Sequence, residues 1–261
     1  MFEIFLLIAV GLAAGVLAGL LGIGGGLVIV PAMTWLLVGQ GAGLDLAVPM
    51  AVATSLGSML LTSLSSIGFH ARRGVVDWQC VIRLGTAVAL GALAGAWLAV
   101  QISGPALARV FAVVAGLIGL RMILATAVPT AERPATPRGW WLAGPAFGAV
   151  SAMVGIGGGS FNVPYLVRNG YPPVRAVAVA AACGWPIALA GSIGYIVQGR
   201  GQELWPLALG YWYLPGVVLI GVAGVAGAPA GVRLAHWLAP GPLRRLFGAF
   251  LLLIALRMAW Q

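Results

Sequence analysis

The sequence predicts an all-α polytopic membrane protein built from two inverted-topology repeats, and three observations support this prediction. Hydrophobic residues make up 61% of the 261 residues and only 7% are charged, with a mean hydropathy of +1.05. A soluble domain carries about 25% charged residues. Apolar runs of about 20 residues, which suffice for one bilayer crossing, fill most of the chain. A glycine-rich decapeptide occurs once in each half.

The two copies of the decapeptide, Gly22–Pro31 and Gly155–Pro164, are identical at seven of ten positions and lie 133 residues apart. Each glycine in a helix interior costs about 1 kcal/mol relative to alanine, so four glycines in five residues predict a broken helix. Glycine- and proline-interrupted segments at corresponding positions of two halves point to the binding site of a transporter. Alternatively, the glycines serve only to let helices pack closely.

The first repeat, residues 1–127, is expected to contain five helical segments. Residues 4–21 form an apolar helix that ends at the first break, and residues 27–38 form a short helix. This pair is either a re-entrant hairpin or two thin crossings. The remaining segments are 45–70, 79–101 and 106–127. Residues 128–139 are rich in proline and charge, which predicts a linker between the repeats.

The second repeat, residues 140–261, follows the same order. The predicted segments are 140–154, 160–168, 174–197, 205–221, 222–238 and 243–260, and the segment 205–221 has no clear counterpart in the first half. Residues 245–258 match residues 109–122 at seven of fourteen positions. We expect eight to ten membrane segments in all, with a glycine-rich broken or re-entrant helix in each repeat.

The charge distribution predicts the orientation. The net charge is +9 and every basic residue is arginine. An odd number of crossings in each half places the halves in opposite senses, with both termini outside, and gathers most arginines on the cytoplasmic side. This set is Arg72, Arg73, Arg133, Arg138, Arg168, Arg175, Arg233, Arg244 and Arg245. Arg109 and Arg257 fall on the other side and count against the assignment.

The breaks predict a site for a small anion. Each short helix begins at a break, where free N–H groups and the positive end of the helix dipole favour negative charge. The long segment 45–70 adds a polar stripe whose hydroxyls either bind the permeant species or hydrogen-bond between helices. The predicted binding residues are Gly22, Gly24, Gly25, Gly26, Thr54, Ser55, Ser58, Gly155, Gly157, Gly158, Gly159, Ser160, Asn162, Trp185 and Arg83.

Three of these residues have alternative roles. Arg83 either attracts an anion toward the entrance or extends its side chain to the lipid headgroups. Trp185 either shapes a cavity wall or packs in the core. Asn162 is the one amide beside a glycine break, and a structural role for it is equally open.

Several functional classes are not supported. Cys80 and Cys183 stand far apart and no Cys/His cluster exists, so neither a metal site nor a disulfide framework is indicated, and no cofactor is expected. The chain contains no lysine and hence no phosphate-binding P-loop, so an ion gradient (H⁺ or Na⁺) or the substrate's own gradient must drive transport. The arginines lie at helix ends, so nucleic acid is not an expected partner. The protein is not expected to be an enzyme, although an intramembrane hydrolase using Ser160 and His236 is a weak alternative.

The chain resembles the sulfite exporter TauE/SafE family of membrane transporters. The resemblance is carried by Gly22–Pro31, Gly155–Pro164 and the element Val52-Ala53-Thr54-Ser55-Leu56, whose counterpart at Ala178–Ala182 lacks Thr-Ser. It implies a secondary transporter in the cell inner membrane that moves sulfite or an organosulfonate by alternating access. An anion channel, or a non-transporting membrane subunit of a larger complex, is the alternative.

Overall fold

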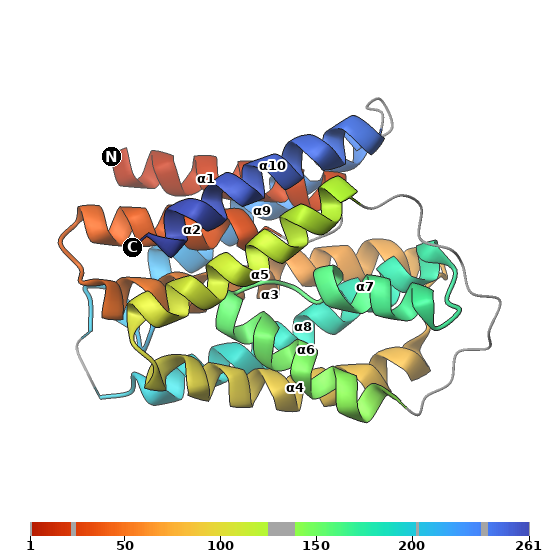
Figure 1. Ribbon diagram of the computed structural model, residues 1–261, viewed down its shortest axis with the longest axis horizontal. Helices are drawn as coiled ribbons and strands as arrows, with labels where there is room; N and C mark the ends of the chain where they lie inside the picture. Colours follow the sequence, from red (N-terminus) through yellow and green to blue (C-terminus); the bar gives the residue numbers. More distant parts are fainter. Residues whose placement is uncertain (1, 22–24, 125–138, 202–203, 236–239, 261) are drawn as a thin grey trace.

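The computed structural model describes residues 2–21, 25–124, 139–201, 204–235 and 240–260, which form ten helices and one two-stranded antiparallel ribbon (Figure 1). The helices of the N-terminal half are α1 (Phe2–Leu21), α2 (Gly26–Gly39), α3 (Leu44–Arg72), α4 (Trp78–Gln101) and α5 (Gly104–Leu124). The elements of the C-terminal half are α6 (Trp140–Val154), α7 (Gly159–Arg168), α8 (Pro173–Gln198), β1 (Ala208–Leu209), β2 (Trp212–Tyr213), α9 (Leu214–Ala235) and α10 (Pro240–Ala259). The all-α polytopic fold is confirmed.

Helix length separates membrane-crossing helices from re-entrant ones. In the described part of the chain, α1, α3, α4, α5, α8 and α9 are long and apolar enough to cross a bilayer. Helices α6 and α7 have 15 and 10 residues, hence lengths of about 22 and 15 Å at 1.5 Å per residue. Neither length reaches the roughly 30 Å of the hydrocarbon core. Helix α6 begins and α7 ends at the same end of the molecule, so together they form a re-entrant hairpin with a glycine tip (Figure 1).

The expectation of two helices over 205–221 and 222–238 is wrong. One helix, α9, covers Leu214–Ala235, and the residues before it turn through β1 and β2. Leu207 and Gly210 both have a φ of 57°, a left-handed conformation that ends any right-handed helix. Gly210 also lies close to α8, because a Cβ there would be 2.6 Å from the carbonyl oxygen of Ile196. Each half therefore has five helices, and α9 occupies in the second half the place of α4 in the first.

The helices pack mainly between the halves. Helix α1 packs along α9 as α6 packs along α4, α2 packs on α3 as α7 packs on α8, and α3 crosses α8 as α5 crosses α10. Exchanging the two halves leaves this pattern unchanged, as a repeat requires. The inverted sense of the repeats and their bounds at 1–127 and 140–261 stay predictions. The linker 128–139 lies outside the described residues except for Gly139.

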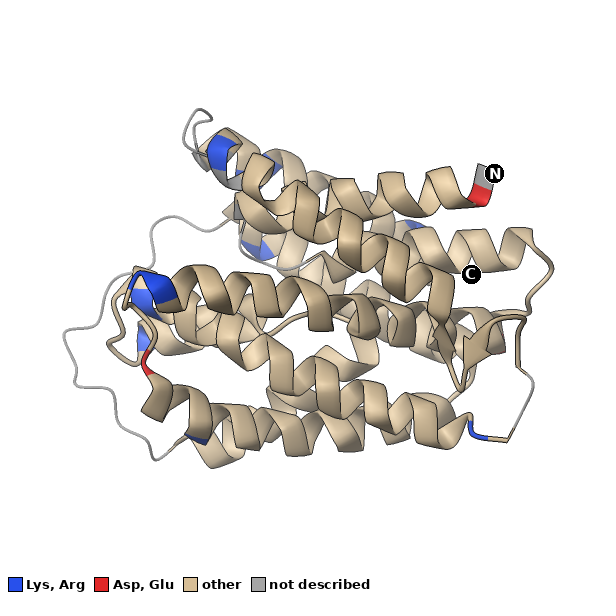
Figure 2. Ribbon diagram, turned by 180° about the vertical axis from the view of Figure 1, so that it is seen from behind, with Lys and Arg blue, Asp and Glu red and all other residues tan. Residues whose placement is uncertain are grey.

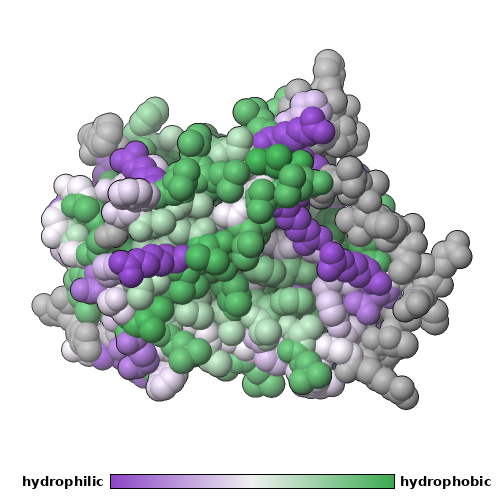
Figure 3. Space-filling view, in the orientation of Figure 1, coloured by the Kyte–Doolittle hydropathy of each residue, from purple (hydrophilic) through white to green (hydrophobic). Residues whose placement is uncertain are grey.

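The two ends of the molecule differ in charge. Both termini lie at one end (Figure 1), and most arginines lie at the opposite end (Figure 2). Hydrophobic side chains cover the middle of the face in Figure 3, and most hydrophilic ones lie toward the two ends. We call these the terminal end and the arginine end. Arg133 and Arg138 lie outside the described residues, and the side that faces the cytoplasm stays a prediction. The protein's six candidate spans in the described residues make it a multi-pass membrane protein.

Helix α3 forms the centre of the molecule. Every residue from Ala47 to Met59 is buried, because α2, α8 and α9 all pack against this part of the chain. The buried segment includes three hydroxyl side chains, Thr54, Ser55 and Ser58. A buried hydroxyl needs a hydrogen-bond partner, so the partners of these three hydroxyls identify the donors and acceptors of the surrounding segments.

Candidate anion-binding site

The two glycine breaks meet against the middle of α3. Gly26 begins α2 and Gly155 follows the last residue of α6. A Cβ added to Gly26 would overlap the carbonyl oxygen of Gly155. The Ser55 hydroxyl donates a hydrogen bond of 2.8 Å to that same oxygen. Three predicted residues from distant parts of the sequence are thus in direct contact, whereas Gly22 and Gly24 lie outside the described residues.

Glycine is required at position 155 for two reasons. Its φ of +69° is left-handed, a conformation that is unfavourable for residues with a Cβ. A Cβ there would also lie 2.8 Å from Cγ2 of Val30 and 3.3 Å from the Cα of Val52. The left-handed residue ends α6 and reverses the chain, which creates the tip of the re-entrant hairpin.

The start of α7 carries a buried amide side chain that has no described partner. Asn162 is completely buried, and neither its amide nitrogen nor its amide oxygen has a hydrogen-bond partner among the described residues. A Cβ added to Gly158 would lie 2.5 Å from the Asn162 Nδ2 and 3.2 Å from the carbonyl oxygen of Ala180 in α8. Gly158 therefore makes room for this amide. The Ser160 Oγ is also buried without a described partner.

An unpaired amide in this position is costly. A buried polar group without a partner loses about 1–3 kcal/mol of stability, and the surrounding membrane offers no compensating water. Such groups in native structures generally have a ligand, an ion or a functional role. The amide lies within one turn of the α7 N-terminus, whose N–H groups and dipole favour the same negatively charged ligand.

The hydroxyls of the polar stripe on α3 form hydrogen bonds within the protein. The Thr54 Oγ1 accepts a hydrogen bond of 3.1 Å from the backbone N–H of Tyr213. The Ser58 hydroxyl donates to the carbonyl oxygen of Ser55 over 2.8 Å. Interhelical and intrahelical bonding thus accounts for these hydroxyls in the present conformation, and their role as ligand donors stays a prediction.

The other predicted site residues fall into two groups. Gly25 caps α2, Gly159 begins α7, and a Cβ on Gly157 would be 3.1 Å from Cε of Met59, so these glycines belong to the two breaks. The role of Arg83 and Trp185 at the site stays a prediction. Arg83 is exposed in the second turn of α4, and Trp185 is half-buried in α8.

Sequence reasoning missed three buried polar residues beside the second break. The Ser151 and Ser192 hydroxyls, on α6 and α8, are buried without a partner among the described residues. Tyr195 donates a hydrogen bond of 3.2 Å to the carbonyl oxygen of Ala152 near the end of α6. A serine or tyrosine in an apolar helix is the only signal that the sequence carries for them, and it does not show which face is buried.

The described acidic side chains lie away from the breaks. Glu3 accepts a hydrogen bond from the Tyr213 hydroxyl, Asp45 accepts one of 2.6 Å from the N–H of Gly104, and Asp77 caps α4 by accepting from the N–H of Cys80. Burial, helped by the Glu3 carboxylate, raises the pKa of Tyr213, so its phenol stays protonated as a donor. No described carboxylate therefore repels an anion at the breaks.

Metal and hydrolase chemistry gain no support from the described residues. They contain no group of three His, Cys, Asp or Glu side chains that could hold a metal ion. The weak hydrolase alternative paired Ser160 with His236, which lies outside the described residues.

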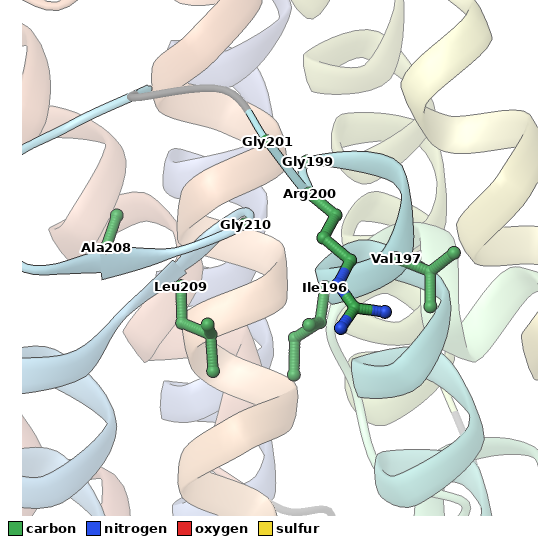
Figure 4. A pocket seen from close by; sticks show the side chains of 8 residues that line it. All are labelled: Ile196, Val197, Gly199, Arg200, Gly201, Ala208, Leu209 and Gly210. Carbon is green, nitrogen blue, oxygen red and sulfur yellow. The ribbon is translucent and has the colours of Figure 1, made fainter.

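A pocket of about 500 Å³ lies at a different place, where the end of α8 meets β1 at the terminal end. Figure 4 shows the Arg200 side chain extending beside Ile196 in this pocket. Its lining residues are Ile196, Val197, Gly199, Arg200, Gly201, Ala208, Leu209 and Gly210. None of them belongs to the glycine breaks, so this pocket is not the candidate site.

Ten helices with a re-entrant hairpin, and two glycine breaks in contact at the centre, define a polytopic membrane protein of the transporter class. The chain belongs to the sulfite exporter TauE/SafE family, whose family model matches residues 7–258. The predicted resemblance is thereby confirmed over nearly the whole chain.

Curated relatives agree with this class. A probable membrane transporter protein of Haemophilus influenzae is 32% identical over 257 residues, which cover 98% of this chain and 97% of the relative. A probable membrane transporter protein of Methanocaldococcus jannaschii is 27% identical over 262 residues, covering 97% and 94%. The probable membrane transporter protein YunE of Bacillus subtilis is 28% identical over 230 residues, covering 80% and 84%. No solved structure matches the chain.

Proposed function

We propose that the protein is a secondary transporter that moves a small sulfur-containing anion, of the sulfite or organosulfonate class, across the inner membrane by alternating access. The substrate class follows from the family, whose description is a sulfite exporter. The observation that carries the location of the site is the completely buried, unpartnered amide of Asn162 beside the second glycine break.

The chemistry of this position suits an oxyanion. The Asn162 Nδ2 is a neutral donor, and the Ser160 hydroxyl provides a second one. The N–H groups at the start of α7 add donors that carry partial positive charge. Neutral donors bind a sulfur oxyanion without the strong attraction of a buried cation, which favours release as well as binding.

Alternating access would use the contact between the two breaks. In Figure 1 the hairpin α6–α7 enters from the arginine end, and α2 runs from the centre to the terminal end. The Gly26–Gly155 contact and the Ser55 hydrogen bond join these elements at the centre. Movement of one hairpin relative to α3 would expose the anion to one side at a time.

Counterflow in proteoliposomes tests the proposal. Vesicles loaded with sulfite, or with a small sulfonate, are supplied with labelled substrate outside, with and without a proton or sodium gradient. A carrier gives saturable counterflow, and the preferred anion identifies the substrate class. A dependence on one gradient identifies the coupling ion. Flux without saturation or counterflow would instead indicate a channel, and no flux from folded protein would indicate a subunit of a larger complex.

Asn162→Ala tests the position of the site. We expect the KM for the anion to rise about tenfold or more, which corresponds to the loss of about 1.4 kcal/mol of binding. Asn169→Ala is the matched control, because the Asn169 amide is already bonded to the carbonyl oxygen of Tyr165 at the far end of α7. An unchanged KM in Asn162→Ala would contradict this site.

A further inference from the structure

A hydrogen bond between a tyrosine and a carboxylate is present at each end of the molecule. At the terminal end, the Tyr213 hydroxyl donates to the Glu3 carboxylate. At the arginine end, the Tyr171 hydroxyl donates to Oδ2 of Asp77 over 3.2 Å. A hydrogen bond to an ionised acceptor is stronger than one between neutral groups. Each bond is therefore a strong link between the elements that it joins.

The two bonds occupy corresponding places in the two halves. Tyr213 directly precedes α9 and Asp77 directly precedes α4, and these helices hold the same place in their halves. Glu3 lies in the first turn of α1. Tyr171 lies beside the start of α6, because its ring centroid is 6.5 Å from that of Trp140. Helices α4 and α6 begin at the arginine end (Figure 1). Each bond thus fastens a helix start to the hairpin beside it.

Each bond is also connected to a glycine break. The Tyr213 N–H donates to the Thr54 hydroxyl over 3.1 Å. The next residue of α3, Ser55, donates to the carbonyl oxygen of Gly155 in the second break. The Tyr171 N–H donates over 3.0 Å to a carbonyl oxygen near the end of α7, the helix that begins at the second break. Breaking either bond would therefore release a segment that is attached to the candidate site.

The candidate site between these bonds is closed toward both ends. Asn162 is completely buried while both bonds are formed. A transported anion must reach this residue from one end and leave toward the other, so the barrier at each end must open in turn. A single charge-assisted hydrogen bond suits such a barrier, because it is strong enough to bias two conformations and weak enough to break repeatedly.

We propose that the Tyr213–Glu3 and Tyr171–Asp77 hydrogen bonds are the two gates of the transport path and that they open alternately. We call them the terminal gate and the arginine gate. The inference rests on the proposed alternating-access function and assigns residues to its two barriers. The two tyrosines act as positioning residues, because they set the populations of the open and closed conformations and do not touch the anion.

Cys80 is a built-in reporter of the arginine gate. It is buried in the first turn of α4, and its N–H donates to Oδ1 of Asp77 over 3.0 Å. The chain has one other cysteine, Cys183, which Cys183→Ala removes. The rate at which a polar maleimide labels Cys80 in the purified full-length protein then measures how often the arginine gate opens. The measurement uses no substrate and requires no flux.

The two gates give opposite expected results. Tyr171→Phe removes the donor of the arginine gate and should raise the labelling rate of Cys80 at least about tenfold. Tyr213→Phe should lower this rate several-fold, because it favours the conformation that is open at the terminal end and closed at the arginine end. Asp77→Asn and Glu3→Gln weaken the same two bonds from the acceptor side and should repeat the rise and the fall. The Tm of each variant shows that it is folded.

Tyr211→Phe is the matched control. The Tyr211 ring packs edge-on against Tyr195, with ring centroids 6.2 Å apart, and it belongs to neither gate. Its labelling rate should equal that of the parent protein. A purely local role for the Tyr213 hydroxyl also predicts an unchanged rate in Tyr213→Phe, because Cys80 lies at the opposite end of the molecule. The fall in labelling therefore separates a gate from a structural hydrogen bond.

Two results would overturn the inference. One is an unchanged rate of Cys80 labelling in both Tyr171→Phe and Asp77→Asn. The other is an unchanged or higher rate in both Tyr213→Phe and Glu3→Gln. Counterflow by the parent protein separates this inference from the proposed function. Counterflow together with either of these results refutes the gates alone, whereas opposite changes in labelling without counterflow support the gates and refute the transport proposal.

Discussion

The two glycine breaks share a backbone sequence but differ in the side chains that follow. Each has Gly-Ile-Gly-Gly-Gly and a proline five residues further on. In the first copy Ile29 occupies the position that Asn162 occupies in the second, and both residues are buried. The first break is therefore apolar where the second offers an amide. The repeated sequence motif is thus followed by a buried polar side chain in only one of its two copies.

The hairpins also differ in length. Helix α1 has 20 residues and is long enough to cross the bilayer, whereas α6, its counterpart, has 15. Helix α2 has 14 residues and α7 has 10. The shorter hairpin is the one with the unpartnered amide, and the longer one is packed along α9. In the proposed assignment, the second half therefore forms the site and the first half packs around it.

The largest effect is expected where the two breaks touch. Gly26→Ala should abolish transport, because its Cβ would overlap the backbone oxygen of Gly155 and overpacking of this kind costs about 1–3 kcal/mol or more. The measurements are counterflow and Tm of the same preparation. Gly43→Ala is the matched control, since a Cβ there meets nothing within 4 Å. Normal counterflow in Gly26→Ala would show that the contact between the breaks is dispensable.

A smaller and more selective effect is expected when the second break is given the side chain of the first. Asn162→Ile removes a buried amide that lacks a described partner, so it should raise Tm while lowering counterflow about tenfold or more, since an unsatisfied amide costs about 1–3 kcal/mol. A packing role predicts the opposite, with lower Tm and retained transport. The reciprocal Ile29→Asn should lower Tm without improving transport, because it places an amide without a hydrogen-bond partner at a buried position.

The smallest effect concerns the hydrogen bond that joins α3 to the second break. Ser55→Ala removes the donor to the Gly155 oxygen and should cost about 1 kcal/mol, as a buried hydrogen bond typically does. Ser58→Ala is the control, because its hydroxyl bonds within α3 itself. Thermal unfolding in detergent measures both variants. If Ser58→Ala lowers Tm as much as Ser55→Ala, the hydrogen bond between α3 and the break stabilises the protein no more than a bond within α3.

Much of the local structure could be predicted from composition and pattern. The segment 79–101 was expected and α4 covers Trp78–Gln101, while 140–154 coincides with α6. Long apolar runs bounded by Gly, Pro and Arg leave few other conformations in a membrane. The prediction for the segment 205–221 is wrong because its apolar residues satisfy the hydropathy criterion, although Leu207 and Gly210 adopt left-handed conformations and Gly210 packs closely against α8.

The site was predictable only in part. The glycines and Asn162 stand out in the sequence because they interrupt an apolar pattern. The engagement of the Thr54 hydroxyl by Tyr213, 159 positions later, could not be foreseen. Nor could the buried hydroxyls of Ser151 and Ser192 be singled out, because their burial depends on which helices pack around them.

The sequence by itself determined the membrane class, the family, the position of both breaks and most helix ends, because these depend on local hydrophobicity, backbone flexibility and motif. Tertiary structure alone decided that Gly26, Ser55 and Gly155 meet and that the Asn162 amide has no described partner. It also decided that the guanidinium group of Arg257 lies over the Trp35 ring. These are contacts between residues far apart in the chain, and they exist only once whole helices have packed together.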